Sequence, residues 1–205
     1  MARPKSIPNR AELIVSAADE LFARYGFERT SIEDIARHLG IGKGSIYLDF
    51  RTKEDILCAI LEKYCQETKA KLEKAVDECE LPALSAFKSI YHKHCLDVYD
   101  YITRDFHTPE SLLHTSVALK GRFKHFHEAK RQTLVRLLRK AADNKEISPR
   151  IVNDDTARII FMTISCLFPP YFNNYSESEN RITREELAER ADRVFDLVVA
   201  GLANL

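Results

Sequence analysis

The sequence predicts an all-α protein of about nine helices. Apolar residues recur every three or four positions along most of the 205-residue chain, as they do on the buried face of a helix. Glycine and proline residues interrupt these periodic stretches, where helices are expected to end. We find no convincing run of strands, and a composition of 45% hydrophobic and 30% charged residues is typical of a globular protein.

Three helices are predicted within the first 50 residues. Leu13, Ala17 and Leu21 are spaced by four, which predicts a helix from about residue 10 to residue 25, ended by Gly26. Thr30 or Ser31 caps a second helix that stops at Gly40. A third, very short helix follows over residues 43–49.

The rest of the chain is predicted to form a helical bundle. Thr52 begins a long helix that runs to about Cys79, and further helices are expected over residues 82–103, 109–119, 121–144, 153–168 and 183–202. The helix over 153–168 is apolar nearly all round, so it must be covered on several sides. We divide the chain into an N-terminal DNA-binding domain, residues 1–52, and a helical ligand-binding and dimerisation domain, residues 53–205.

The second and third helices have the spacing of a helix-turn-helix. Ala36, Gly40 and Ile46 lie at offsets of four and ten. A small residue lets the two helices approach, a glycine makes the turn because it accepts positive φ, and a branched apolar residue fills the angle between the helices. This motif predicts contact with DNA.

The short third helix is predicted to turn polar groups outward. Ile46 and Phe50 face inward, which leaves a lysine to supply charge, hydroxyls to donate to phosphate oxygens and a glycine where the backbone comes close. Lys53 adds a donor at the next helix start. Ordinary surface polarity is the alternative interpretation. The predicted DNA-binding residues are Thr30, Ser31, Lys43, Gly44, Ser45, Tyr47, Leu48 and Lys53.

Residues 9–60 resemble the DNA-binding domain of the tetracycline-repressor (TetR/AcrR) family. The resemblance rests on these residues: Ala17, Leu21, Phe22, Gly26, Thr30, Ile35, Ala36, Gly40, Lys43, Gly44, Ser45, Tyr47, Phe50, Lys53 and Glu54. It implies a homodimeric repressor that binds double-stranded operator DNA and leaves it when a small-molecule effector binds.

Two positions depart from the family pattern. Gly42 stands where the family usually has Ser, Thr or Ala as the cap, and Asp49 stands where it usually has His or Tyr. An aspartate facing phosphates would repel them, so Asp49 either pairs with Arg51 or accepts from a cytosine amino group. Before the motif, Arg3, Lys5 and Arg10 form either an arm that reaches the minor groove or a disordered tail.

A mixed apolar and polar pocket is expected between the fourth and eighth helices, where the resemblance places it. For each residue alone, plain core packing is the alternative. The candidate lining residues are Tyr64, His92, Cys95, Tyr99, His107, Phe126, Phe161 and Phe168. Residues 120–150 hold ten Lys/Arg against three Asp/Glu, which indicates either a site for anionic ligands or, as we favour, a solvated helix face. The cations that mostly avoid the apolar stripe are Arg122, Lys130, Arg131, Arg136, Arg139 and Lys140.

The last two long helices are predicted to form the dimer interface. Each carries more apolar surface than one stripe can hide, so two helices from each subunit would close a four-helix bundle across a two-fold axis. The predicted interface residues are Ile159, Met162, Cys166, Val194, Val198 and Leu202.

Other classes of protein are disfavoured. The five cysteines form no C-x-x-C pair, so we expect reduced thiols in a cytoplasmic protein, with no structural metal and no cofactor. The beginning of the chain has no apolar signal segment, and the longest uncharged apolar stretch, residues 159–172, is too short for a membrane span. A redox- or metal-responsive regulator remains an alternative, because His92 and Cys95 share a helix face. An α-helical enzyme is a third hypothesis, but no catalytic constellation stands out, so no catalytic residue is assigned.

Overall fold

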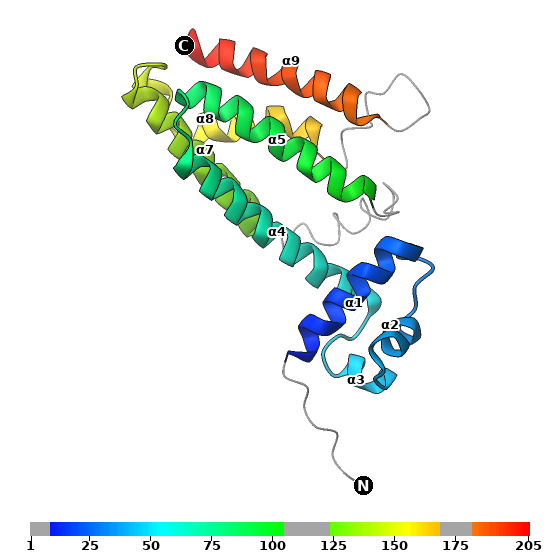
Figure 1. Cartoon of the computed structure of the whole chain (residues 1–205). Helices are drawn as coiled ribbons and strands as arrows, with labels where there is room; N and C mark the ends of the chain where they lie inside the picture. Colours follow the sequence, from blue (N-terminus) through cyan, green and yellow to red (C-terminus); the bar gives the residue numbers. More distant parts are fainter. Residues whose placement is uncertain (1–8, 105–123, 169–181) are drawn as a thin grey trace.

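The computed structural model describes residues 9–104, 124–168 and 182–205, and Figure 1 shows their arrangement. Within these ranges the regular elements are eight α-helices and two short 3₁₀-helices, which confirms the all-α class. The helix expected over residues 109–119 lies outside the described residues.

The first three helices form where the sequence predicts them. Helix α1 (Arg10–Tyr25) ends at Gly26, whose φ is 88°. Helix α2 (Ile32–Leu39) begins at Ser31, which forms a capping box with Asp34, and ends at Gly40 with φ 65°. Both glycines therefore occupy backbone conformations that other residues rarely adopt. Helix α3 (Lys43–Tyr47) is shorter than expected, because Leu48 already ends the helix and the chain turns toward Phe50.

These helices surround a first hydrophobic core. Ile46 is fully buried and Ala36 is 4% exposed, so both contribute to the helix–helix contact that the motif predicts. The same core continues into the first turns of α4 (Lys53–Glu78), through Ile56, Leu57 and Ile60. Helix α4 then extends away from this unit along the second one, as Figure 1 shows.

A second core lies between the remaining helices. These are α5 (Ala83–Arg104), α7 (Lys124–Asp143), α8 (Asp154–Ile164) and α9 (Arg184–Ala203), with the 3₁₀-helices η1 (Pro149–Ile151) and η2 (Ser165–Leu167). Helices α5 and α9 run side by side in Figure 1, and Phe87 and Phe195 join them with ring centroids 5.6 Å apart. The backbone N–H groups of Ala83 and Leu84 donate to the Glu146 carboxylate at 2.7 and 2.9 Å, which caps α5 from a distant part of the chain.

Helix α8 ends earlier than the sequence suggested. The α-helix stops at Ile164, η2 continues to Leu167, and Phe168 is extended with φ −120° and ψ 157°. Pro169 follows Phe168 in the sequence, and a residue before proline avoids the helical region, so the apolar pattern outlasts the helix. Among the helices in the described ranges, none combines the length and the hydropathy needed to cross a bilayer.

Candidate nucleic-acid interface

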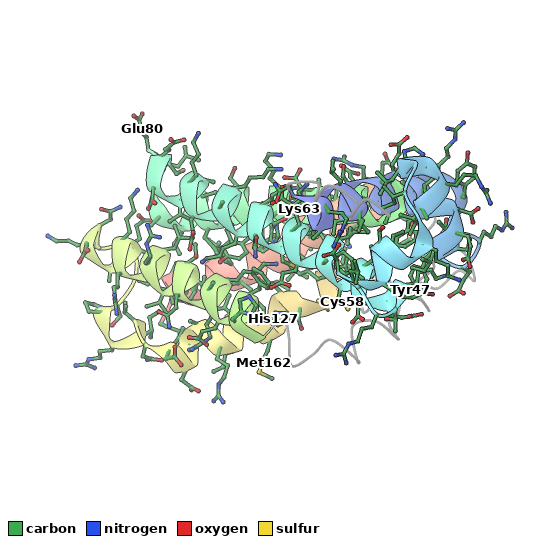
Figure 2. The ribbon with its side chains drawn as sticks, turned by 90° about the horizontal axis from the view of Figure 1, so that it is seen from below. Tyr47, Cys58, Lys63, Glu80, His127 and Met162 are labelled. Atoms are coloured by element: carbon green, nitrogen blue, oxygen red, sulfur yellow. The ribbon has the colours of Figure 1, made fainter. Side chains whose placement is uncertain are left out.

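Helix α3 presents large side chains to solvent. Tyr47 is 45% exposed and Leu48 is 75% exposed, while Ile46 between their faces is fully buried. Lys43 and Gly44 are exposed as well, and Ser45 is half-buried. Figure 2 shows Tyr47 at the end of the molecule opposite Glu80. Exposed tyrosine and leucine on one turn contribute little to this fold, but they suit contact with a partner.

The charge on Lys43 has a partner within the domain. Its ammonium forms an ion pair with Glu33 of α2 and lies 5.6 Å from the centroid of the Tyr47 ring. The hydrogen bond from Lys43 lowers the pKa of Glu33, and the same bond raises the pKa of Lys43. Both groups therefore stay charged, and Lys43 must leave Glu33 before it can contact a phosphate.

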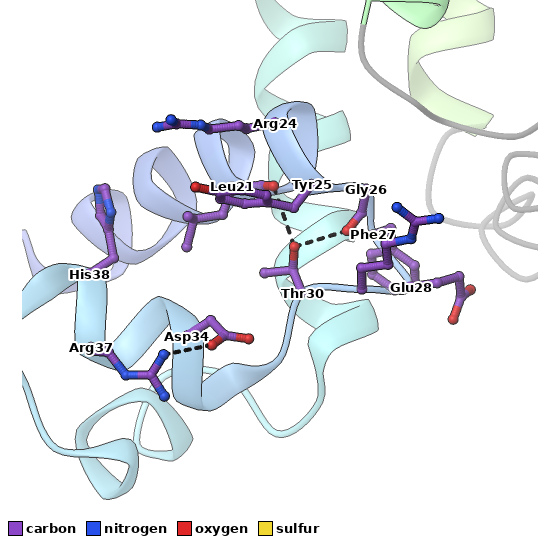
Figure 3. Close-up of a pocket in the computed structure, with 11 residues that line it drawn as sticks. Leu21, Arg24, Tyr25, Gly26, Phe27, Glu28, Thr30, Asp34, Arg37 and His38 are labelled. Atoms are coloured by element: carbon purple, nitrogen blue, oxygen red, sulfur yellow. Dashed lines mark hydrogen bonds and ion pairs between the residues drawn. The ribbon is translucent and has the colours of Figure 1, made fainter.

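Thr30 and Ser31 are used to build the motif. The Thr30 side chain is 3% exposed, and its hydroxyl faces the carbonyl oxygens of Gly26 at 2.9 Å and Leu21 at 3.3 Å, as Figure 3 shows. The predicted DNA contact of this side chain is thus replaced by a structural role. The Ser31 hydroxyl donates to the Asp34 carboxylate at 2.5 Å and accepts from the Asp34 N–H at 3.2 Å, so Ser31, not Thr30, caps α2.

Lys53 is also held inside the protein. Its ammonium donates to the carbonyl oxygen of Phe27 at 2.7 Å and lies 4.2 Å from the centroid of that residue's ring. These two contacts join the start of α4 to the segment between α1 and α2. Lys53 therefore positions the helix-turn-helix on α4, which the sequence pattern alone did not indicate.

Asp49 pairs with an unexpected cation. The Arg10 Nε donates to one Asp49 carboxylate oxygen at 2.6 Å and Nη2 donates to the other at 3.1 Å. This hydrogen bonding holds the pKa of Asp49 below its usual range. Neither alternative offered for Asp49, Arg51 or a base, is needed, and Arg10 is not part of a free arm. Arg3 and Lys5 lie outside the described residues.

An open hollow of about 750 Å³ lies between the end of α1 and α2. Figure 3 shows it lined by Arg24, Arg37 and His38. Arg37 pairs with Asp34 at 3.0 Å, and His38 lies 3.7 Å from Glu20. This polar concavity belongs to the N-terminal unit and lies apart from the pocket that we expected between the later helices.

Most of the predicted pocket residues are engaged in the second core. The Cys95 thiol donates to the Leu167 carbonyl oxygen at 3.2 Å, and the Tyr99 hydroxyl donates to that of Ile182 at 2.8 Å. His92 Nε2 lies 3.2 Å from the Ala188 carbonyl oxygen on α9. Phe126 is buried, Phe161 packs edge-on against His127, and His107 is outside the described residues. These side chains do not line one shared cavity, so core packing describes them better than a pocket wall.

A groove of about 580 Å³ lies instead between α4 and α5. Of the predicted set only Tyr64 lines it, and its ring stacks on Tyr101 at a centroid distance of 3.6 Å. His94 also lines this groove and is 6% exposed, although we had favoured His92. The helical period could have found it, because His94 follows the buried Tyr91 by three residues and precedes the buried Val98 by four.

The predicted dimer residues divide into two groups. Ile159 and Met162 on α8 are 56% and 66% exposed, and Figure 2 shows Met162 projecting from the molecule. Cys166, Val194 and Val198 are half-buried. Leu202 is 5% exposed within the second core, so its assignment to the interface is wrong. Leu197 on α9, which we missed, is 75% exposed.

The thiols sit in environments that suppress reactivity. Burial raises the pKa of Cys95 to about 12 and also raises the pKa of Cys65. In the described part of the chain, no cluster of three or more His, Cys, Asp or Glu side chains is arranged to hold a metal ion.

Comparison with known proteins agrees with the helix-turn-helix. Residues 14–60 match the model of the bacterial regulatory proteins of the tetR family. An HTH-type transcriptional regulator of Bacillus subtilis, YhgD, is 32% identical over 69 residues, which are 34% of this chain and 36% of that protein. Another from the same organism, YfiR, is 28% identical over 142 residues, 66% of this chain and 67% of that protein. The chain spans only 24–36% of the length of the first curated relatives that it matches.

Solved structures share the whole fold. A transcriptional regulator from Cytophaga hutchinsonii has a TM-score of 0.70 at 21% identity, covering 93% of this chain and 97% of that chain. FadR from Bacillus subtilis, solved in complex with stearoyl-CoA, has a TM-score of 0.61 at 20% identity, covering 94% and 99%.

A helix-turn-helix with an exposed third helix, carried on a separate helical bundle, defines a class of DNA-binding regulators. The chain belongs to the tetR family of bacterial regulatory proteins.

Proposed function

We propose that this protein is a transcriptional repressor that binds palindromic operator DNA as a homodimer and leaves it when a small-molecule effector binds. The observation that carries the proposal is helix α3, which exposes Tyr47 and Lys43 while Ile46 anchors it in the first core. On this proposal α3 enters the major groove, Tyr47 and Ser45 reach phosphates or bases, and Leu48 offers an apolar contact. The proposed place of action is the cytoplasm, and we propose no enzymatic reaction.

Dimerisation would use the apolar faces of α8 and α9. Ile159, Met162 and Leu197 leave large side chains exposed there, which a second copy would cover. A two-fold dimer would place its two α3 helices in successive major grooves, about 34–36 Å apart, and this separation selects a palindromic site.

Helix α4 would couple the two units. We propose the division at residues 52 and 53 as a functional boundary, with α4 contributing Ile56 and Ile60 to the first core and Leu72 and Val76 to the second. An effector that moved the second half of α4 would tilt the first unit and change the separation of the two α3 helices. The similarity to FadR, which binds stearoyl-CoA, supports an organic effector held among the later helices.

The test is binding to duplex fragments from upstream of the protein's own gene, followed by fluorescence anisotropy. The wild-type protein should bind one fragment in preference to random duplex of equal length. Tyr47→Ala should weaken that binding by roughly tenfold, and Tyr25→Ala is the matched control, since Tyr25 is 48% exposed on α1. A protein that prefers no fragment, or a Tyr47 variant that binds as tightly as the control, would contradict the proposal.

A further inference from the structure

Lys130 on α7 is a partly buried cation without an anionic partner. Its Nζ lies 5.8 Å from the centroid of the Phe168 ring, and no carboxylate of the described ranges forms an ion pair with it. Its neighbour Arg131 pairs with both Glu128 and Asp154. Burial lowers the pKa of Lys130, because the charged form loses hydration that no partner replaces.

His94 on α5 lies beside this cation. It is 6% exposed, and its Nε2 is buried without a hydrogen-bond partner. Its ring centroid is 5.2 Å from that of Phe168, which also faces Lys130. Lys130 is near enough to lower the pKa of His94 and of His127, which Figure 2 shows on α7. A cation and an unsatisfied ring nitrogen therefore meet at one point of the second unit.

His94 also belongs to the lining of the groove between α4 and α5. The groove has aromatic and apolar walls, formed by Tyr64, Tyr101, Leu72 and Ile90. Its volume of about 580 Å³ falls in the range of sites for small organic molecules. The groove thus joins an apolar space to the pair of polar groups that lack partners.

Partly buried charges and buried donors cost free energy until they are paired. A ligand that brings a negative group would supply the counter-charge for Lys130 and a hydrogen-bond acceptor for His94. We propose that the effector is an organic acid, whose apolar body lies in the α4–α5 groove and whose anionic group binds Lys130 and His94. This inference rests on the proposed effector-released function, but it is tested without DNA.

The probe is anilinonaphthalene sulfonate, an aromatic anion whose fluorescence rises in apolar sites. Its matched neutral partner is phenylnaphthylamine, which has the same ring system without the sulfonate. The wild-type protein should bind the anion about tenfold more tightly than the neutral probe, as expected for a charge-assisted contact. Lys130→Met should remove this preference and leave the affinity for the neutral probe unchanged, whereas Lys130→Arg should retain it.

Two controls locate the effect. Lys93→Met removes an equal charge at the groove's rim, where Lys93 pairs with Asp97 at 2.9 Å, and should keep most of the preference. His94→Leu should reduce it in part. Thermal melts report whether each variant is folded, and Lys130→Gln replaces the methionine variant if that one is not. No preference for the anion in the wild type, or a preference that survives the loss of Lys130, would overturn the inference. Operator binding, measured separately, tells this failure from failure of the proposed function.

Discussion

Arg10, the first residue of α1, is bonded through two nitrogens to Asp49, which follows α3, with Nε 2.6 Å and Nη2 3.1 Å from the carboxylate oxygens. The pair fastens the exposed helix to the start of the chain's first helix. It also neutralises an acidic group that would otherwise lie beside bound phosphates.

This pair predicts a compensating double mutant. Arg10→Ala should weaken operator binding by roughly three- to tenfold, because Asp49 is left as an unpaired negative charge near the DNA. Arg10→Ala combined with Asp49→Ala should recover most of the loss. Fluorescence anisotropy of the four proteins on one duplex measures the coupling, and a double mutant weaker than Arg10→Ala would mean that Arg10 itself contacts DNA.

Much of the N-terminal unit could be predicted from the sequence, because its signals are local. Gly26 and Gly40 mark turns that need positive φ, and Ile46 fills the helix–helix angle, all within a few residues of their partners. Contacts between distant residues left no such signal. Arg10 and Asp49 are 39 positions apart, and the carbonyl of Phe27 is 26 positions from Lys53. Lys53 looked like a DNA contact because composition cannot tell a free lysine from a bonded one.

The second unit was harder to predict for a related reason. Lys130 stood among many cations of a helix that reads as solvated, and its neighbours Cys65 and His94 come from two other helices. Leu202 continues an apolar stripe, and such a stripe fits a core as well as an interface. Which side of a helix faces its own subunit depends on packing between distant elements, and a single sequence does not encode it legibly.

Glu33 competes with DNA for Lys43. Glu33→Gln should strengthen operator binding, because Lys43 no longer has to break an ion pair before it contacts a phosphate. Lys43→Ala should weaken binding and reduce the dependence of log K on log salt by about one unit. Titrations at several salt concentrations give both quantities. An unchanged salt slope in Lys43→Ala would remove Lys43 from the phosphate contacts.

Lys130 should make the free energy of unfolding depend on pH. In the unfolded chain this lysine holds its proton up to the ordinary pKa of 10.5, whereas the folded protein releases it earlier. The unfolded state therefore binds more protons in the window just below pH 10.5, and stability rises with pH there relative to Lys130→Met. Urea melts of both proteins across that window measure the difference. The methionine variant should also be the more stable one near neutral pH, and equal pH dependence of the two proteins would refute the assignment.

Cys95 should resist thiol reagents in the folded protein. It is 1% exposed, and burial raises its pKa to about 12, so almost no thiolate exists near neutral pH. Labelling of Cys95 followed by mass spectrometry should be slow in buffer and fast in urea. Operator binding should be unaffected by mild peroxide. Rapid modification of folded Cys95 together with DNA release would instead favour a redox-responsive regulator.

The exposed face of α8 and α9 gives the sharpest test of the dimer. Ile159, Met162 and Leu197 are more than half exposed, and covering such side chains contributes about 25 cal/mol for each Å² of apolar surface removed from water. A stable dimer on this face should bury more than ~2,000 Å² in total. Met162→Asp or Leu197→Asp should therefore yield monomers in analytical ultracentrifugation, and operator affinity should fall because a monomer holds only one half-site. Leu81→Asp is the matched control, since Leu81 is 48% exposed just before α5 and should leave the dimer intact. Leu202→Asp should instead unfold the protein, because Leu202 is buried within its own subunit. If Met162→Asp and Leu197→Asp both remain dimeric with full operator affinity, the subunits meet on another face, and the route from effector to DNA cannot run through these two helices.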